Sequence, residues 1–293
     1  MKKLTTKQYE DFSMNGRVEI LLASEHDDRH EDSIHEDSGV YVIRDENIDL
    51  MVDSIKGKKK MDLSEDGMLG SSYPYIDNYF QGILDNLIVN KKVEEKRYDL
   101  KDKNILITGT SNGWYEAWVL AHGGIPYVLE LKDIDYDGDK IHYIDVNEAK
   151  KLSNNGDLKF DYCISFSTFE HSGLGRYGDK IEADGDLKAM MEIFDLLADG
   201  GILFLSVPIG FDRVVYPLHR IYGKARIPHL FNKWTLKGMN GCWWMDFLQD
   251  FGVGHQPIFI LQKDIRYPYD VDFYNDMLRF GMVAHTTNIL DLY

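Results

Sequence analysis

The order of apolar and polar positions divides the chain into two parts. From residue 104 onward, short apolar runs alternate with stretches whose apolar positions repeat every three or four residues. Such runs are typical of buried strands, and such repeats are typical of helices with one buried face. The pattern predicts strands at 105–110, 125–132, 140–146, 159–167, 201–210 and 257–264. It predicts helices at 112–124 and 185–201, and a further helix within 234–252.

The alternation of strands and helices over residues 99–293 predicts an α/β fold. Its expected form is a Rossmann-like, doubly wound and mostly parallel sheet. In residues 1–98, a polar run of mixed charge precedes a predicted strand at 39–45 and a predicted amphipathic helix at 71–89. We therefore expect an N-terminal mixed extension, which would cap the acceptor site or mediate self-association. Three tyrosines are candidates to line this cap or its core: Tyr73, Tyr75 and Tyr79.

The formal net charge of −16 narrows the choice of partners. A surface that binds nucleic acid or an anionic membrane has to be basic, so both partners are disfavoured. Hydrophobic residues make up 44% of the chain, enough for a real core, and no apolar run reaches the length of a membrane span. Cys163 and Cys242 cannot build a disulfide framework. These features favour a soluble cytoplasmic protein that acts on a small molecule.

Doubly wound sheets bind ligands beyond the carboxyl ends of their strands. A glycine-bearing turn joins the first predicted strand to the first predicted helix. Gly109 permits the tight turn, while Ser111 and Gly113 keep side chains small where a ligand approaches backbone amides. Glu130 ends the second strand, where an acid can bind two ribose hydroxyls, and Asp145 ends the third, where it can approach a base edge. Together these features predict a nucleoside site.

The nucleoside is not fixed by the turn alone. The sequence TGTSNG fits the start of short-chain NAD-dependent dehydrogenases, which also need a Tyr-x-x-x-Lys pair on a late helix. Tyr136 and Lys140 have that spacing but lie between the second and third strands, and Tyr177 and Lys180 are one residue too close. An NAD-dependent sugar-modifying enzyme is therefore the second hypothesis.

Several segments between residues 104 and 263 resemble the class I S-adenosylmethionine-dependent methyltransferase superfamily. The resemblance rests on the glycine turn, on the acids that follow the second and third strands, and on residues 160–173, where a Glu-His pair follows the fourth strand. Residues 198–208 also resemble the entry to the fifth strand of that superfamily. Ile107 departs from the pattern, because superfamily members usually carry there an acid that holds the methionine amino group.

Two further segments, 170–190 and 218–226, resemble a methyltransferase-like family catalogued as a domain of unknown function. The superfamily resemblance implies a Rossmann-like fold and S-adenosyl-L-methionine as the cofactor. The implied cofactor contacts are Gly109, Thr110, Ser111, Gly113, Glu130, Leu131, Asp145, Val146, Ser165 and Phe166.

The segment FEHSGLGRYGD, residues 169–179, carries the densest chemistry. Methyl transfer to a hydroxyl requires alignment of the acceptor and removal of a proton, and a histidine suits the second task. His171 is the first candidate base, and Glu170 would orient it or bind the cofactor. The alternative is that both residues only shape the cofactor pocket. The three glycines of the segment fit either a pliable lid or ordinary turns.

Arg176 and Tyr177 lie at the centre of this segment. In a chain this acidic, an arginine at the ligand edge points to an anionic acceptor such as a phosphate or carboxylate. A salt bridge from Arg176 to Asp179 or Glu182 is the alternative interpretation.

A second cluster follows the fifth predicted strand. His219 is a rival base, with structural packing as the competing account, and Arg220, Tyr222 and Arg226 are candidate substrate contacts. The polar run near the N-terminus holds His26, His30 and His35 among acids, but no recognised zinc spacing, so we expect no metal.

These observations favour a methyltransferase that O-methylates a small polar or anionic acceptor. A sugar, a nucleotide-sugar or a glycan precursor is the expected class, which would place the protein in carbohydrate biosynthesis. A third hypothesis is a catalytically silent, methyltransferase-like binding protein.

Overall fold

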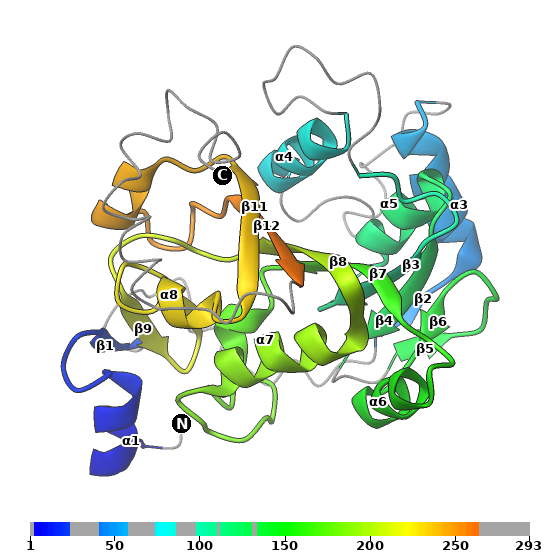
Figure 1. Cartoon of the computed structure of the whole chain (residues 1–293). Helices are drawn as coiled ribbons and strands as arrows, with labels where there is room; N and C mark the ends of the chain where they lie inside the picture. The colour runs from blue at the N-terminus through cyan, green and yellow to red at the C-terminus, as the bar shows by residue number, and fades with distance from the viewer. Residues whose placement is uncertain are drawn as a thin grey trace. The chain divides into compact units, whose positions relative to one another are not determined.

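The computed structural model describes residues 3–23, 41–57, 74–85, 98–109, 112–130 and 134–263. The chain divides into two compact units, and Figure 1 labels most of their helices and strands. The first unit comprises residues 1–38, 167–194 and 206–293. The second comprises residues 39–166 and 195–205.

The second unit contains the predicted parallel sheet. β3 pairs in parallel with β4 and with β7, and β4 pairs in parallel with β6. The strand order β6-β4-β3-β7-β8 is the 3-2-1-4-5 order of a doubly wound fold. The α/β, Rossmann-like fold is thus confirmed. The strands are β3 (Asn104–Thr108), β4 (Ile125–Leu129), β6 (His142–Tyr143), β7 (Phe160–Phe166) and β8 (Leu197–Ser206).

Segments from the N-terminal part of the chain belong to this same unit. β2 (Tyr41–Ile43) pairs in parallel with β5 (Ile134–Tyr136), and α3 (Asp45–Ile55) packs against α5 (Trp114–Ala121). α6 (Val146–Asn155) completes the helices that follow the strands.

The predicted amphipathic helix at 71–89 is confirmed as α4 (Pro74–Leu84) over its described residues. Its Phe80 is fully buried, and the Phe80 ring centroid lies 5.3 Å from the ring centroids of Phe166 and Phe204. The centroid of Trp118 lies 5.6 Å from it. Phe80 therefore joins helix α4 to the apolar core around β7 and β8.

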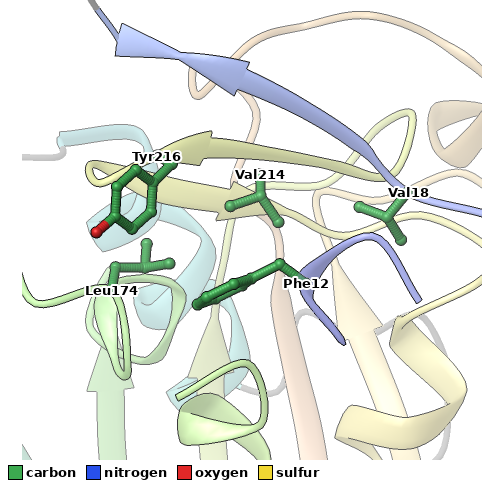
Figure 2. Packing of buried hydrophobic residues seen from close by; sticks show 5 residues of the cluster. All are labelled: Phe12, Val18, Leu174, Val214 and Tyr216. Atoms are coloured by element: carbon green, nitrogen blue, oxygen red, sulfur yellow. The ribbon is translucent and has the colours of Figure 1, made fainter. Parts of the chain in front are cut away.

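The first unit has a three-stranded sheet of its own. β1 (Glu19–Leu22) pairs in parallel with β9 (Arg213–Tyr216), which pairs in antiparallel fashion with β10 (His219–Ile221). α1 (Thr6–Phe12) begins at a capping box formed by Thr5 and Gln8. Figure 2 shows how this sheet gains a core: Phe12, Val18, Leu174, Val214 and Tyr216 pack together and are all buried.

The remaining elements of the first unit follow from later segments. β11 (Trp234–Asn240) and β12 (Ile258–Lys263) form an antiparallel pair with an irregularity between Leu236 and Gly238. The other elements are the 3-10 helices η2 (Phe169–His171) and η3 (Trp244–Leu248), and the α-helices α7 (Gly185–Leu196) and α8 (Ile227–Leu230).

The helix predicted within 234–252 is present only as the short 3-10 helix η3. Residues 234–240 form a strand, because they pair with the apolar strand β12 and contain a glycine that weakens a helix. At the start of η3 the Asp246 carboxylate accepts a hydrogen bond from the backbone N–H of Trp243 at 2.7 Å. Strand β8 also begins earlier than expected, directly after α7.

Candidate functional site

The nucleoside edge predicted from the sequence lies in the second unit. β3 and β4 are in register with Thr108 opposite Leu129, so Gly109 and Glu130 follow at neighbouring positions beyond the carboxyl ends of the two strands. Gly109 is exposed with φ of 73°, and Glu130 is half-buried. Neighbouring parallel strands lie about 4.8 Å apart, so one ligand can contact both positions. Thr110, Ser111 and Leu131 lie outside the described residues.

Gly113 has another role than the one expected. It is buried, and a Cβ atom added to it would lie 2.6 Å from Cδ1 of Ile48 on α3 and 3.4 Å from Cγ2 of Ile43 on β2. Its backbone is also left-handed, with φ of 82°. Gly113 therefore permits close packing against β2 and α3, and its contact with a cofactor stays a prediction.

Asp145 is likewise used within the fold. Its Oδ1 accepts hydrogen bonds from the backbone N–H groups of Asn147 at 2.7 Å and Glu148 at 3.0 Å, so it is the N-cap of α6. Val146 is the first residue of this helix and is half-buried. The sequence pattern does not predict α6, because its composition is mostly polar, and so it does not predict the capping role of Asp145.

The end of β7 is enclosed by aromatic side chains. Phe166 is 4% exposed, and its ring centroid lies 5.0 Å from that of Tyr115. Ser165 is fully buried, and its hydroxyl has no hydrogen-bond partner among the described residues. Ile107 is buried between Val128 and Ile164 of the neighbouring strands, so this position supplies packing and no acid.

The spacing that an NAD-dependent enzyme needs is present but serves the fold. The Tyr136 hydroxyl donates to Asp45 at 2.6 Å, and Lys140 Nζ lies 2.7 Å from Asp49 Oδ1. Burial and the hydrogen bond to Asp45 raise the pKa of Tyr136 to about 12. A tyrosine that transfers a proton near neutral pH needs the opposite shift.

The cluster at 169–179 lies in the first unit, on and after the short helix η2. Ser167, just before it, has a left-handed backbone with φ of 54°, a rare conformation for a residue with a side chain. Its hydroxyl donates to Glu170 Oε1 at 2.6 Å. Glu170 is 1% exposed, and its Oε2 has no hydrogen-bond partner among the described residues. Burial raises the pKa of Glu170 to about 7.

His171 has a defined tautomer. Its Nδ1 lies 2.6 Å from the carbonyl oxygen of Leu218, which can only accept, so Nδ1 carries the proton and Nε2 keeps its lone pair. Nε2 lies 3.7 Å from Glu170 Oε1. Burial, with help from Arg176 and Arg220, lowers the pKa of His171 to about 4 although the Leu218 carbonyl opposes this shift. The imidazole is therefore neutral at physiological pH.

Arg176 joins this arrangement and does not pair with the acids of the alternative interpretation. Its Nη1 lies 3.4 Å from the Leu218 carbonyl, and its guanidinium stands over the Tyr177 ring at 5.1 Å. Tyr177 is 41% exposed and meets the His171 ring edge-on, with 5.7 Å between centroids. Asp179 instead accepts from the backbone N–H of Gly173, and Glu182 pairs with Lys180 and Lys188.

The glycines of this segment serve turns and close packing. A Cβ atom on Gly173 would lie 2.2 Å from the carbonyl oxygen of Glu182 and 2.9 Å from Cα of Gly185. Gly175 and Gly178 also have positive φ angles. The turn interpretation is favoured over that of a pliable lid.

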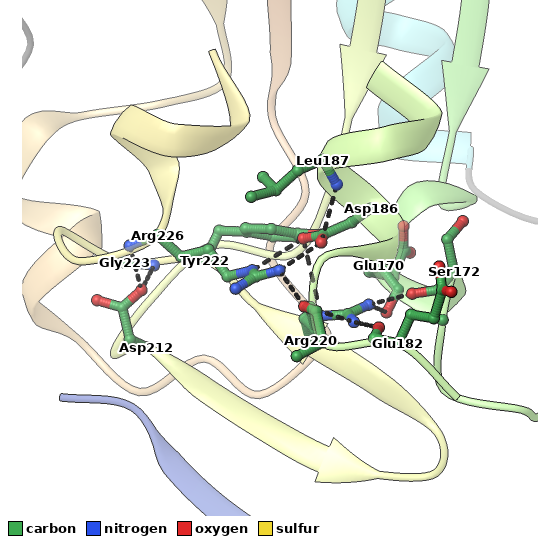
Figure 3. A network of polar contacts seen from close by, with 12 residues as sticks. Glu170, Ser172, Glu182, Asp186, Leu187, Asp212, Arg220, Tyr222, Gly223 and Arg226 are labelled. Atoms are coloured by element: carbon green, nitrogen blue, oxygen red, sulfur yellow. Dashed lines mark hydrogen bonds and ion pairs between the residues drawn. The ribbon is translucent and has the colours of Figure 1, made fainter. Parts of the chain in front are cut away.

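Behind the segment lies a buried ionic network, shown in Figure 3. Asp186, at the start of α7, is fully buried and pairs with Arg226, while its Oδ2 accepts from the Tyr222 hydroxyl at 2.9 Å. Arg220 Nε lies 3.7 Å from the same oxygen. Burial opposes ionisation of Asp186, but the two arginines outweigh it and keep its pKa below the ordinary value.

Arg220 connects this network to the segment that carries Glu170. Its Nη1 donates to the carbonyl oxygens of Ser172 at 2.6 Å and Glu170 at 3.4 Å, and its Nη2 donates to the carbonyl of Ala183 at 3.3 Å. We find that Arg220, Tyr222 and Arg226 are buried among internal partners rather than displayed to a substrate. These internal contacts position the segment, and contact of the three residues with a substrate stays a prediction.

His219 is 9% exposed and lies on β10 opposite Val215. This placement favours the packing account of His219 over that of a rival base. Three polar residues of the first unit escaped the sequence analysis: Ser167, Asp186 and Gln256. Their only sequence signal is a polar side chain beside an apolar run, which is too common to identify them.

Within the part of the chain that the structure describes, no group of three His, Cys, Asp or Glu side chains is placed to hold a metal. The histidines at 26, 30 and 35 lie outside the described residues. No described helix combines the length and the apolar character needed to cross a bilayer.

Comparisons with known proteins add a family description. Residues 102–239, a little under half of the chain, match a family model described as "Caenorhabditis protein of unknown function, DUF268". None of the curated proteins matches the sequence.

Some solved structures are similar to this chain, at low identity and low TM-score. A 1,6-didemethyltoxoflavin-N1-methyltransferase from Burkholderia thailandensis is 15% identical, with a TM-score of 0.41 over 67% of this chain and 92% of its own. The N-methyltransferase NodS from Bradyrhizobium japonicum is 12% identical, with a TM-score of 0.41 over 69% and 99%. A candidate hemolysin from Streptococcus thermophilus is 11% identical, with a TM-score of 0.41 over 78% and 76%. Likenesses this weak do not transfer an activity.

Proposed function

We propose that this protein is an S-adenosylmethionine-dependent methyltransferase that O-methylates a small polar acceptor, with a sugar or sugar derivative as the acceptor class. The observation that carries the proposal is the side-by-side placement of Gly109 and Glu130 at the carboxyl ends of β3 and β4. A close backbone turn beside a carboxylate is the arrangement that a nucleoside needs, with the acid on the ribose hydroxyls. The sequence resemblance to methyltransferases selects the cofactor.

We propose a separate role for each of the following residues. Gly109 and Glu130 would hold the nucleoside part of the cofactor, which when bound supplies an electrophilic methyl group on a sulfonium. His171 is the proposed base, because the Leu218 carbonyl fixes its tautomer and leaves Nε2 able to accept the proton of an acceptor hydroxyl. Arg220 positions the backbone of this segment through the carbonyls of Glu170 and Ser172.

A second candidate function is a catalytically silent binding protein with the methyltransferase fold. The packing of Gly113 against Ile48 supports it, because the start of α5 is covered there by an apolar side chain. The buried Ile107 supports it too, since that position lacks the acid that usually holds the methionine part. The NAD-dependent alternative has less support, because Tyr136 is bound to Asp45.

The deciding experiment is calorimetry of the full chain with S-adenosylmethionine and S-adenosylhomocysteine, followed by transfer of a radiolabelled methyl group to a panel of sugars and nucleotide-sugars. The enzyme proposal expects binding of both nucleosides, and loss of binding when Glu130 is replaced by glutamine. Glu148→Gln, an exposed change on α6, is the matched control. Absence of heat with either nucleoside would leave the silent protein as the better account.

A further inference from the structure

Two buried acceptor atoms without donors lie on side chains that meet at one hydroxyl. Glu170 and Gln256 are 1% and 2% exposed, and the structure gives no hydrogen-bond partner to Glu170 Oε2 or Gln256 Oε1 among the described residues. The Ser167 hydroxyl donates to Glu170 Oε1 at 2.6 Å and accepts from Gln256 Nε2 at 3.3 Å. An unsatisfied buried acceptor is costly, so two on one cluster call for an explanation.

The orientation of the Gln256 amide is fixed by its neighbours. Nε2 donates both to Ser167 Oγ and to the carbonyl oxygen of Val253, at 3.3 and 3.4 Å, which uses both of its protons. Oε1 therefore faces away from these partners. The backbones of Ser167 and Gln256 are also held in place by Ser206. The Ser206 carbonyl oxygen accepts from the N–H of Ser167 at 2.9 Å, and the Ser206 hydroxyl donates to the Gln256 carbonyl oxygen at 3.3 Å.

We infer that Ser167, Glu170 and Gln256 form a binding site for a hydroxyl-bearing ligand, with two neighbouring hydroxyls as its recognised group. Each free acceptor would receive one O–H proton. That this ligand is the methyl acceptor rests on the proposed function. Binding of the ligand does not, because it requires no methyl transfer.

Local charge and protonation favour a hydroxyl over an ammonium group. The positive charges of Arg176 and Arg220 act on Glu170 and would repel a cationic ligand. Because the pKa of Glu170 lies at about 7, its Oε2 is an acceptor above that pH and a donor below it. A hydroxyl can both donate and accept, so it satisfies Glu170 in either state, while an ammonium cannot.

Ser167 keeps a side chain on a left-handed backbone, with φ of 54°. A left-handed residue is ordinarily glycine, and strained residues of this kind concentrate where a side chain is needed. Here the side chain holds Glu170 and Gln256 in place.

The test is ligand-observed NMR on the full chain with defined probes. The first arm uses methyl glycosides of glucose, mannose and galactose with their monodeoxy forms, and the second uses adenosine with 2′-deoxyadenosine. A third arm uses ethylammonium. We expect one diol-bearing probe to bind, its deoxy form to lose at least tenfold in affinity, and ethylammonium not to compete. The first two arms distinguish an acceptor sugar from a nucleoside ribose.

Two variants assign the binding to this cluster. Gln256→Leu and Glu170→Gln should each weaken the dissociation constant at least tenfold, while the exposed Gln249→Leu and Glu148→Gln should leave it within twofold. Circular dichroism establishes whether each variant is folded. If Glu170→Gln does not fold, Gln256→Leu alone tests the inference.

The inference is overturned if no diol probe binds, if ethylammonium binds better, or if the variants leave binding unchanged. Parallel calorimetry with S-adenosylhomocysteine separates the two claims. A protein that binds this nucleoside but no diol at the cluster contradicts the inference alone, and the reverse result contradicts the proposed function alone.

Discussion

The backbone carbonyl of Leu218 lies 2.6 Å from Nδ1 of His171, although 47 residues separate them in the sequence. Leu218 lies in the turn between β9 and β10, and His171 ends η2, so the first unit brings the two together only when its small sheet is formed. The contact fixes which imidazole nitrogen is basic. It therefore connects the folding of β9 and β10 to the chemistry proposed for His171.

Replacing His171 by alanine should lower kcat for methyl transfer about a hundredfold or more, the usual loss when a general base is removed. The reason is that Nε2, the proposed proton acceptor, disappears while the segment stays held by Arg220. The measurement is transfer of radiolabelled methyl at saturating substrate. His142→Ala, an exposed change in the second unit, is the control. A loss confined to KM would assign His171 to binding rather than proton removal.

The unfolding free energy should respond to pH in opposite directions through Glu170 and His171. The folded pKa of Glu170 is raised from 4.5 to about 7, so its contribution is fully present below pH 4.5 and is lost as pH rises toward 7. The folded pKa of His171 is lowered from 6.5 to about 4. Its contribution to stability is therefore fully present above pH 6.5 and is lost as pH falls toward 4. In the native protein the two effects largely cancel.

Single variants should uncover each effect. As pH rises from 4.5 to 7, the free energy of unfolding of Glu170→Gln should increase by roughly 3 kcal/mol relative to that of the native protein. As pH rises from 4 to 6.5, that of His171→Gln should decrease by a similar amount relative to the native protein. Urea unfolding at half-unit steps of pH measures both slopes. Parallel curves for the native protein and either variant would show that the environment of that group is not the buried one described.

Asp186→Asn should destabilise the first unit by about 3–5 kcal/mol, because Arg220 and Arg226 would lose the buried carboxylate that lies against both. Asp184→Asn lies two residues away, is exposed and pairs only on the surface with Lys188, so it should cost within about 1 kcal/mol. Equilibrium unfolding in urea compares the two. Equal effects would mean that the network does not hold this unit together.

The sequence predicted the sheet well because its strands are continuous apolar runs. β7 is buried along most of its length, and such a run has few alternatives to a covered strand. It did not predict β9 and β10, since each is short and Arg213, His219 and Arg220 interrupt their apolar side chains.

The candidate site was predictable only in part, for a similar reason. Glu170, His171 and Arg176 were identified by their density in one segment. Gln256 was not, because it lies 89 residues from Ser167 and becomes its neighbour only in the folded unit. A sequence pattern reports local spacing, whereas hydrogen-bond partners of this kind are set by tertiary structure.

Gly113→Ala tests whether the start of α5 is covered as the structure describes. The substitution combines a left-handed backbone with a Cβ atom 2.6 Å from Cδ1 of Ile48. Gly156→Ala is the matched control, because Gly156 also has a positive φ, 81°, but no atom lies within 4 Å of the added Cβ. It should therefore show only the backbone cost, about 1–2 kcal/mol. Gly113→Ala should cost a further 1–3 kcal/mol, roughly, from overpacking.

Ile48→Val then separates the steric part from the backbone part, since it removes the Cδ1 atom that the new methyl group meets. In a double-mutant cycle followed by urea unfolding, Ile48→Val should cost about 0.5–1.5 kcal/mol alone and recover part of the loss when combined with Gly113→Ala. Strictly additive costs would contradict the contact and indicate an open start to α5. In that case the region would be free to receive a ligand, and the main support for the catalytically silent alternative would be removed.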